Sequence, residues 1–259
     1  GIRTVALIGP LADSRTDMLG TWSAQGKPED VITLRNALEL RARPNGFRLL
    51  YAKGTEIRGT SDAGFVEAVD AASQADVVLL ALGEDASWMT GEGASRAFID
   101  LPGNQQQLLE RVAATGKPIA LVLFSGRPLA LTQVASRVHA ILEAWSPGVQ
   151  AGPALERVLF GEVAPVGRLT ATFPRSLGQV PIYHSVLSTG RPPVGLDLTR
   201  PPTNGGEKYR SRYVDEQNAP LYPFGFGLTY TSFEYSAPQT SVQQIGVEDL
   251  NAGRAQLRV

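Results

Sequence analysis

The chain of 259 residues lacks cysteine altogether and contains only two histidines, His139 and His184. The absence of cysteine excludes disulfides, thiolate zinc sites and a cysteine nucleophile. Two histidines cannot form a three-histidine metal site, and they leave few ways to build a Ser-His-Asp triad. We therefore predict no metal site.

Long basic runs and long apolar runs are also missing. The formal net charge is −1, which argues against nucleic acid as a partner. No apolar run reaches the roughly 18 residues that a membrane span needs, so no membrane partner is expected either. The chain begins at Gly1 without Met or a signal peptide and ends in a short alternating stretch, 255–259, from which we expect a fragment of a longer protein.

What the sequence does contain is an alternation of apolar runs and helical patterns. The predicted strands are Val5–Gly9, Arg48–Tyr51, Val77–Gly83, Ile119–Ser125, Ala140–Trp145 and a short one around Arg168–Phe173. The predicted helices are Val31–Arg41, Ala63–Gln74, Gln105–Ala114 and Gly152–Phe160, with Asp30 and Ser61 as caps of the first two. This order predicts an α/β three-layer sandwich with a mostly parallel sheet of about six strands.

The composition changes towards the C-terminus. Residues 174–227 are rich in Pro, Gly and Tyr, which indicates a long ordered excursion without a second core. Residues 231–259 alternate like the opening strands of a β-sandwich. We therefore predict an α/β-sandwich domain over 1–230 and an incomplete start of a fibronectin-III-like domain over 231–259.

The loop after the third predicted strand is the most polar part of the core. It carries three carboxylates, Glu84, Asp85 and Glu92, and glycines on both sides of Glu92 allow the backbone to project that side chain into a cleft. Ligands bind beyond the carboxyl ends of parallel strands, which is where this loop lies. The alternative interpretation is a solvated surface loop.

Several motifs occur together in a set order. They are Glu92-Gly93-x-x-Arg96 followed by 100–105 (DLPGNQ), Ser125–Leu129 (SGRPL), 144–148 (AWSPG), Gly167–Leu169 with Phe173-Pro174, and 222–230 (YPFGFGLTY). In this order they resemble glycoside hydrolase family three. Two further segments, 9–13 (GPLAD) and 188–192 (STGRP), resemble the periplasmic β-glucosidases of that family.

This resemblance implies an active site shared by two domains. An N-terminal (β/α)-barrel, which this chain lacks, would supply an Asp nucleophile, and the present chain would supply Glu92 as the general acid/base. The implied reaction is exo-acting, retaining hydrolysis of β-D-glucosidic bonds in gluco-oligosaccharides or aryl glucosides. No cofactor is implied, the chain alone should be inactive, and the resemblance implies a periplasmic or secreted location.

Other residues are candidates for supporting roles. Many members of the family have Asp where Ser95 stands, and Arg96 is expected to pair with Glu84 or Asp85 as a loop-supporting residue. Trp22 and Trp88 are candidates for stacking on the leaving-group sugar, although each ring could instead anchor its loop. Arg191 could line the edge of the cleft, or it could form an interdomain salt bridge.

Other functions remain possible from the sequence. A β-xylosidase or an exo-glucanase of the same family would use the same groups. A non-catalytic, flavodoxin-like binding module would require a Gly-rich phosphate-binding turn after the first strand, and the segment Ile8-Gly9-Pro10 lacks one. A family member that has lost catalysis would be a carbohydrate-binding or scaffolding domain, which the presence of Glu92 between its glycines argues against.

Overall fold

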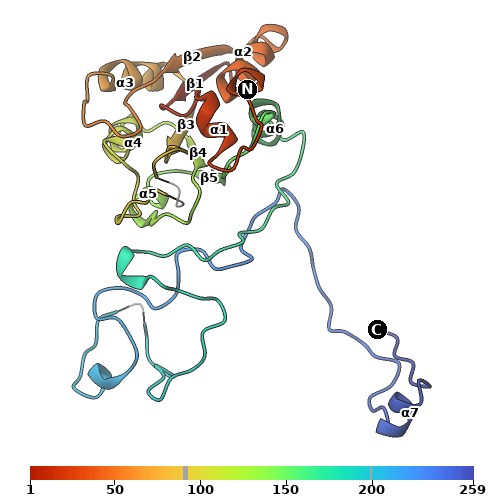
Figure 1. Ribbon diagram of the computed structural model, residues 1–259. Coiled ribbons are helices and arrows are strands. Elements are labelled where there is room, and N and C mark those ends of the chain that lie inside the picture. Colours follow the sequence, from red (N-terminus) through yellow and green to blue (C-terminus); the bar gives the residue numbers. More distant parts are fainter. Residues whose placement is uncertain (90–92, 199) are drawn as a thin grey trace. The chain divides into compact units, whose positions relative to one another are not determined.

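The computed structural model describes residues 1–89, 93–198 and 200–259. It divides into two compact units, Gly1–Leu228 and Thr229–Val259. The first unit contains a parallel sheet of five strands, in the order β2-β1-β3-β4-β5 (Figure 1). The strands are β1 (Thr4–Ile8), β2 (Arg48–Ala52), β3 (Val77–Gly83), β4 (Ile119–Phe124) and β5 (Ala140–Glu143). This confirms the predicted α/β sandwich.

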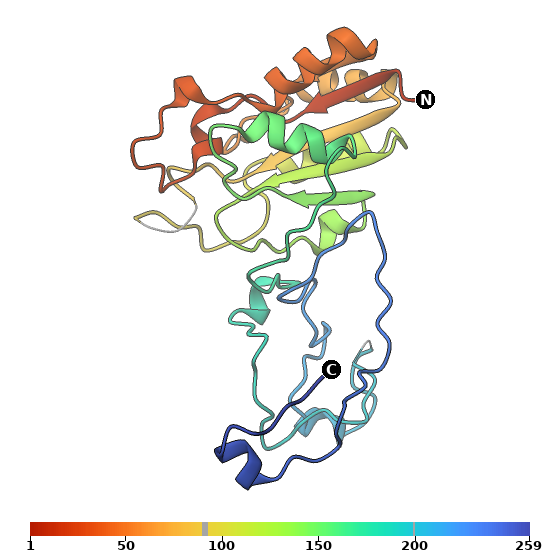
Figure 2. The same ribbon diagram turned by 90° about the vertical axis from the view of Figure 1, so that its right-hand side faces the viewer.

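Helices cover both faces of the sheet (Figure 2). They are α1 (Arg15–Leu19), α2 (Leu34–Asn45), α3 (Phe65–Gln74), α4 (Gln105–Ala113), α5 (Thr132–Ala135) and α6 (Ala151–Leu159). Successive residues of a strand point to opposite faces. Val5 and Leu7 accordingly pack with α2 and α6, whereas Ala6 and Ile8 pack with α3 and α4. The central strands β1, β3 and β4 are buried on both faces and are almost entirely apolar, which is the pattern that made them predictable. The edge strands β2 and β5 are only partly buried.

Two of the predicted helix caps are wrong. Thr33, not Asp30, caps α2, because its Oγ1 accepts a hydrogen bond from Asn36 N at 3.1 Å while the Asn36 side chain accepts one from Thr33 N. Asp30 instead ends the short 3₁₀ helix Pro28–Asp30. Ser61 does not cap α3 either, because that helix begins after Gly64, beyond the reach of the Ser61 hydroxyl.

The sheet has five strands where about six were predicted. The segment around Arg168–Phe173 forms only an isolated antiparallel bridge, between Phe173 and Tyr222. Phe173 is 1% exposed and packs against Trp145, with 5.8 Å between the ring centroids. The hydrophobic side chains of this segment are thus buried against the core, but its backbone does not join the sheet.

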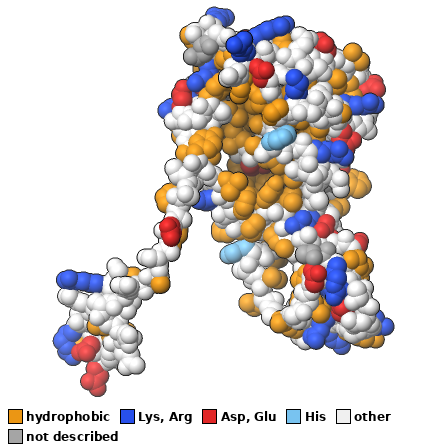
Figure 3. Space-filling model, turned by 180° about the vertical axis from the view of Figure 1, so that it is seen from behind, with side chains coloured by type: hydrophobic (Ala, Val, Ile, Leu, Met, Phe, Trp, Pro, Cys, Tyr) orange, Lys and Arg blue, Asp and Glu red, His pale blue; other side chains and the backbone are white. Residues whose placement is uncertain are grey.

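Residues 174–228 form an excursion with two 3₁₀ helices, Leu177–Gln179 and Glu207–Tyr209. Its large hydrophobic residues are mostly exposed, and Figure 3 shows hydrophobic side chains gathered on one face of the molecule.

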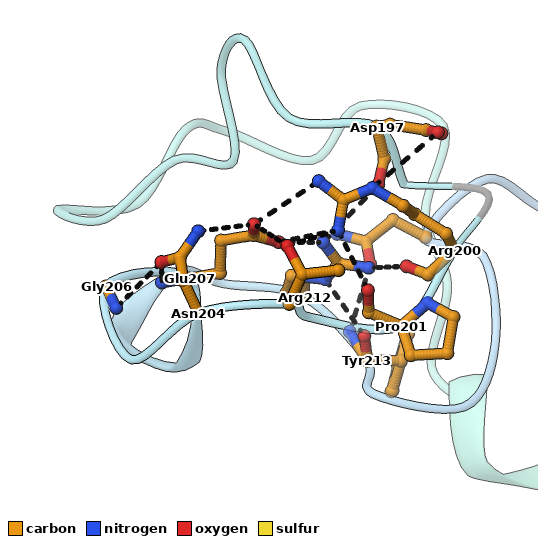
Figure 4. Close-up of polar contacts among 10 residues, drawn as sticks. Asp197, Arg200, Pro201, Asn204, Gly206, Glu207, Arg212 and Tyr213 are labelled. Carbon is orange, nitrogen blue, oxygen red and sulfur yellow. Dashed lines mark hydrogen bonds and ion pairs between the residues drawn. The ribbon is translucent and has the colours of Figure 1, made fainter.

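Part of the excursion is held by a polar network around Glu207 (Figure 4). The carboxylate of Glu207, 5% exposed, accepts hydrogen bonds from Arg200, Arg212, Thr203 and Asn204. The hydrogen bond from Arg200 is the main reason that the pKa of Glu207 lies below its ordinary value.

The second unit, Thr229–Val259, contains one helix, α7 (Val247–Asn251). None of the described residues of this unit forms a β-strand. A fibronectin-III-like domain is built from strands that pair with one another. The expected domain over 231–259 therefore stays a prediction. None of the helices in the described parts of the chain is long and apolar enough to cross a bilayer.

Candidate functional site

The carboxyl ends of the parallel strands meet at one edge of the sheet, and the polar loops lie there. β3 ends at Gly83, and its pairing with β4 continues one residue further through Glu84 N, which donates to Phe124 O at 2.9 Å. The Glu84 side chain, 0% exposed, is therefore held beside the end of β4. A buried carboxylate requires charged or hydrogen-bonding partners.

Two arginines supply these partners. Arg127, in the turn after β4, donates to both carboxylate oxygens of Glu84: Nη2 lies 2.9 Å from Oε1 and Nε lies 3.2 Å from Oε2. Arg96 Nη1 lies 3.1 Å from Oε1 of the same residue. The three side chains form an ion cluster in which two partly buried arginines surround one fully buried carboxylate.

The same two arginines hold the loop that follows residues 90–92. Arg127 Nη1 donates to Ser95 Oγ at 3.0 Å and to the carbonyl oxygen of Arg96 at 2.9 Å. Arg96 in turn donates to the carbonyl oxygen and to the carboxylate of Asp100, at 2.6 and 2.8 Å. The segment 95–100 is thus tied to the end of β3. Glu92, the predicted acid/base, lies outside the described residues, as do Thr90 and Gly91.

Asp85 shapes the other half of the loop. Its Oδ1 accepts hydrogen bonds from Ser87 N at 3.1 Å and from Trp88 N at 2.7 Å, which closes a tight turn just before the undescribed residues. Arg58 Nε lies 3.0 Å from the other carboxylate oxygen, Oδ2. Of the two carboxylates considered as partners of Arg96, Glu84 contacts that arginine, and Asp85 pairs with Arg58.

Gln105 is a buried side chain whose role sequence reasoning did not identify. It is 0% exposed and bridges the end of β3, because Oε1 accepts from Gly83 N at 2.8 Å and Nε2 donates to Gly83 O at 2.7 Å. Nε2 also donates to Ile57 O at 3.0 Å, in the loop after β2. A Gln at the start of a helix is ordinarily solvated, so its partners 22 and 48 residues away left no signal in the local pattern.

The loop after β1 is tied to the loop after β3. Asp17 Oδ1 accepts from Ala86 N at 2.8 Å, and Thr21 Oγ1 donates to Ala86 O. Trp22, which follows Thr21, is 80% exposed, and Trp88 is 61% exposed. Neither ring is packed into the core. Trp145, by contrast, packs on Phe173 in the core.

Arg191 lies in the excursion. Its guanidinium lies 5.7 Å from the centroid of the Tyr209 ring, and its carbonyl oxygen accepts from Ser211 N at 2.8 Å. These contacts belong to the excursion itself, so they do not bring Arg191 together with the Glu84 cluster. His139 also has a structural contact, because its Nδ1 accepts from Ile119 N at 3.1 Å.

Glu143, at the end of β5, is a second residue that sequence reasoning missed. One of its carboxylate oxygens accepts from Trp145 N at 3.1 Å and from Ser125 Oγ at 3.4 Å, while Oε2 is buried without a hydrogen bond among the described residues. Burial raises the pKa of Glu143 to about 8. The signal was a single Glu that ends an otherwise apolar strand.

The described residues contain no group of three or more His, Asp or Glu side chains that could hold a metal ion. This edge of the sheet brings carboxyl groups together with arginines and exposed aromatic rings. The loops after β1, β3 and β4 position these groups.

Comparison with known proteins identifies the family. A family model described as the glycosyl hydrolase family 3 C-terminal domain matches residues 1–230. A periplasmic beta-glucosidase of Salmonella typhimurium is 44% identical over 90% of this chain and 32% of its own length. A beta-xylosidase of Formosa agariphila is 37% identical over 98% of this chain and 34% of its own length.

Solved structures agree with these relatives. The crystal structure of a beta-glucosidase from Listeria innocua in complex with isofagomine has a TM-score of 0.79 and 39% identity, covering 93% of this chain and 31% of that one. The chain spans about a third of the length of the curated relatives it matches. The family match, the relatives and the shared fold agree over almost the whole of the first unit, and the chain therefore belongs to glycosyl hydrolase family 3.

Proposed function

We propose that this chain contributes to the exo-acting, retaining hydrolysis of β-D-glucosidic bonds, with Glu92 as the general acid/base. The observation that carries the proposal is the cluster of Glu84, Arg96 and Arg127. It anchors the loop that begins directly after Glu92 to the carboxyl edge of the sheet, and a catalytic carboxyl group requires a rigidly held loop.

The second catalytic carboxylate belongs to the N-terminal barrel of the full-length protein, which supplies the nucleophile and the contacts to the nonreducing sugar. In a retaining mechanism the two carboxyl groups lie about 5–5.5 Å apart. The nucleophile forms a glycosyl-enzyme while Glu92 protonates the leaving oxygen, and Glu92 then deprotonates the incoming water. In this proposal Trp22 and Trp88 flank the leaving-group sugar, and the chain without its barrel is inactive. Arg191 stays a candidate for the cleft edge or for an interdomain salt bridge, and its described contacts lie within the excursion.

The test uses the full-length protein and its Glu92→Ala variant with aryl β-glucosides. With a good leaving group the variant should form the glycosyl-enzyme quickly, stall at deglycosylation, and be rescued by azide with formation of β-glucosyl azide. Glu67→Ala, at an exposed position on α3, is the matched control and should behave as wild type. If Glu92→Gln turns over poorly activated glucosides at the wild-type rate, the assignment of the acid/base is wrong.

A second candidate activity is β-xylosidase, favoured by the relative of that name from Formosa agariphila. Because the nonreducing sugar is bound mainly by the barrel, both sugars are compatible with the groups on this chain. Paired kcat/KM values on p-nitrophenyl β-glucoside and β-xyloside decide between them. A full-length protein that hydrolyses neither would favour a binding or scaffolding role.

A periplasmic or secreted location is part of the proposal. It is supported by the periplasmic relative from Salmonella typhimurium. Fractionation of cells that express the full-length gene, with the activity assayed in each fraction, tests the location. Activity confined to the cytoplasmic fraction would overturn it.

A further inference from the structure

The backbone of Trp145 has a conformation that a bulky residue rarely adopts. Its φ angle is 50°, in the left-handed region, which costs free energy for a residue with a Cβ and persists only where the surroundings enforce it. Glu143, at the end of β5, contributes to this, because its Oε1 accepts a hydrogen bond from Trp145 N at 3.1 Å. The indole packs on Phe173 in the core. The turn after β5 is thus held by one side-chain acceptor and one buried ring.

The same carboxyl group reaches the end of the neighbouring strand. Ser125, which follows β4, donates from Oγ to Glu143 Oε1 at 3.4 Å. Arg127, in the same turn, holds Glu84 and the segment that begins at Ser95. Glu143 therefore contacts the base of the turn whose arginine anchors the loop after β3.

The turn at Trp145 also contacts the loop after β1. Gly148 N donates to Met18 O at 2.7 Å, and a Cβ at Gly20 would overlap the Ser146 side chain, so the two loops lie directly against each other. The residue after Gly20 is in turn hydrogen-bonded to the loop after β3. The loops after β1, β3, β4 and β5 thus form one connected set at the carboxyl edge of the sheet.

The Glu143 side chain fits this place in its neutral form. Its Oε2 is buried and has no hydrogen-bond partner among the described residues, and a charge buried without partners is far costlier than a neutral group. Burial is the largest cause of the raised pKa of Glu143, and the hydrogen bonds from Trp145 N and Ser125 Oγ lower it only in part. No charged side chain of the described residues contributes, and the guanidinium of Arg127 is bound to Glu84. At neutral pH Oε1 therefore acts as a carbonyl oxygen, and Oε2 carries the proton.

We propose that Glu143 is a positioning residue for the reaction, which in its neutral form holds the turn at Trp145 and so keeps the loops after β1, β3 and β4 in place for catalysis. The inference rests on the proposed function, because it assumes that these loops carry the reacting groups. When Glu143 loses its proton, water solvates the carboxylate better than the buried site does, so the side chain leaves its place and Trp145 N loses its acceptor. Glu143 contacts no substrate in this proposal, so its effect falls on kcat and not on KM.

The test follows kcat against pH in the full-length enzyme, with an aryl β-glucoside whose leaving group needs no protonation. Deglycosylation then limits kcat, which a burst of the released phenol verifies, and Glu92 acts in this step as a base, so its own titration lowers no rate at alkaline pH. In wild type kcat should fall above about pH 8. Glu143→Gln keeps a neutral side chain with the acceptor oxygen. Its kcat at neutral pH should stay within about twofold of wild type, and the alkaline fall should disappear.

Further variants separate positioning from folding. Glu143→Ala removes the acceptor, so kcat at neutral pH should fall about tenfold with KM nearly unchanged, in a variant that still unfolds cooperatively. Hydrogen exchange at Trp145 N should be faster in Glu143→Ala than in wild type, but not in Glu143→Gln, when all three are compared at one pH. Glu67→Gln changes an exposed carboxyl on α3 and is the matched control, which should keep the wild-type pH profile.

The outcomes that contradict the proposal differ from those that contradict the proposed function. A wild-type kcat that stays constant above pH 8, or an alkaline fall that is the same in wild type and Glu143→Gln, would overturn the positioning role. A wild type that hydrolyses no β-glycoside would overturn the proposed function instead. In that case hydrogen exchange at Trp145 N still decides whether Glu143 holds the turn.

Discussion

Arg127 donates hydrogen bonds to both carboxylate oxygens of Glu84, and with the same guanidinium it reaches Ser95 Oγ and the carbonyl oxygen of Arg96. One side chain thus joins the end of β3, the turn after β4 and the loop that carries the proposed acid/base. The planar, five-donor guanidinium is what allows a single group to make all of these contacts.

Replacing Arg127 should therefore weaken both stability and activity. Arg127→Ala leaves Glu84 buried with only Arg96, and we expect the free energy of unfolding to fall by about 3 kcal/mol. Arg127→Lys keeps the charge but loses the paired donors, so its kcat in the full-length enzyme should fall by at least tenfold with a smaller loss of stability. Urea unfolding and kcat on an aryl β-glucoside measure the two effects. Arg111→Ala, on the exposed face of α4, is the control, and an equal effect there would contradict the role of the cluster.

Gln105→Leu tests the bridge at the end of β3. The substitution removes the partners of Gly83 N and Gly83 O in a buried place, and each unsatisfied group costs about 1–3 kcal/mol. The urea midpoint should fall accordingly. Gln106→Leu is the matched comparison, because the one side-chain hydrogen bond of Gln106 among the described residues goes to Glu110 in its own helix. Equal midpoints for the two variants would show that Gln105 does not brace the strand.

Gly83 and Gly116 both have positive φ angles, 146° and 71°, but their surroundings differ. A Cβ at Gly83 would overlap the carbonyl oxygen of Phe124, whereas a Cβ at Gly116 would meet nothing within 4 Å. Gly83→Ala should prevent β3 and β4 from pairing and yield little folded protein. Gly116→Ala should lower the free energy of unfolding by only about 1 kcal/mol, because alanine adopts a left-handed backbone less readily than glycine. Soluble yield and thermal unfolding compare the pair.

The raised pKa of Glu143 predicts that the stability of the folded chain depends on pH. Its pKa is about 8 in the folded chain against an ordinary value of 4.5, so the folded state holds a proton that the unfolded state has lost between these values. Stability is therefore fully present below pH 4.5 and decreases as the pH rises towards 8, by about 1.4 kcal/mol per unit across this interval.

The Glu143→Gln variant measures this contribution. It keeps a neutral side chain of the same shape at every pH, so its stability relative to wild type should increase between pH 5 and 8. Thermal unfolding of both proteins at several pH values gives the difference. A constant difference across this range would show that Glu143 titrates normally in the folded chain.

The parts of the fold that could be predicted are those with a strong local signal. The bounds of β3 were predicted to the residue, because a run of apolar side chains from Val77 to Leu82 is buried on both faces. The segment around Arg168–Phe173 alternates polar and apolar residues, as a strand with one buried face does, yet its backbone does not join the sheet. Whether an apolar segment pairs with a sheet depends on the rest of the chain, which a local pattern does not contain.

In the candidate site, too, some features could be predicted from the local sequence and others could not. The polar loop after β3 and the possible pair of Arg96 with Glu84 could be inferred from spacing and strand order. Gln105 and Glu143 could not be assigned roles, because their partners are distant in sequence and their importance comes from burial. The predicted cap of α2 was wrong because Asp30 and Thr33 are both acceptable cap residues. The reciprocal hydrogen bonds between Thr33 and Asn36 select Thr33, and they form only in the folded chain.

The unpaired outer edge of β5 affects how the isolated chain behaves in solution. It is the last strand of the sheet and pairs only with β4, so among the described strands none covers its outer edge. An uncovered edge is a template on which another chain can add a strand. The isolated chain should therefore self-associate at high concentration through this edge, and added lysines on β5 would be the simplest means of keeping it monomeric.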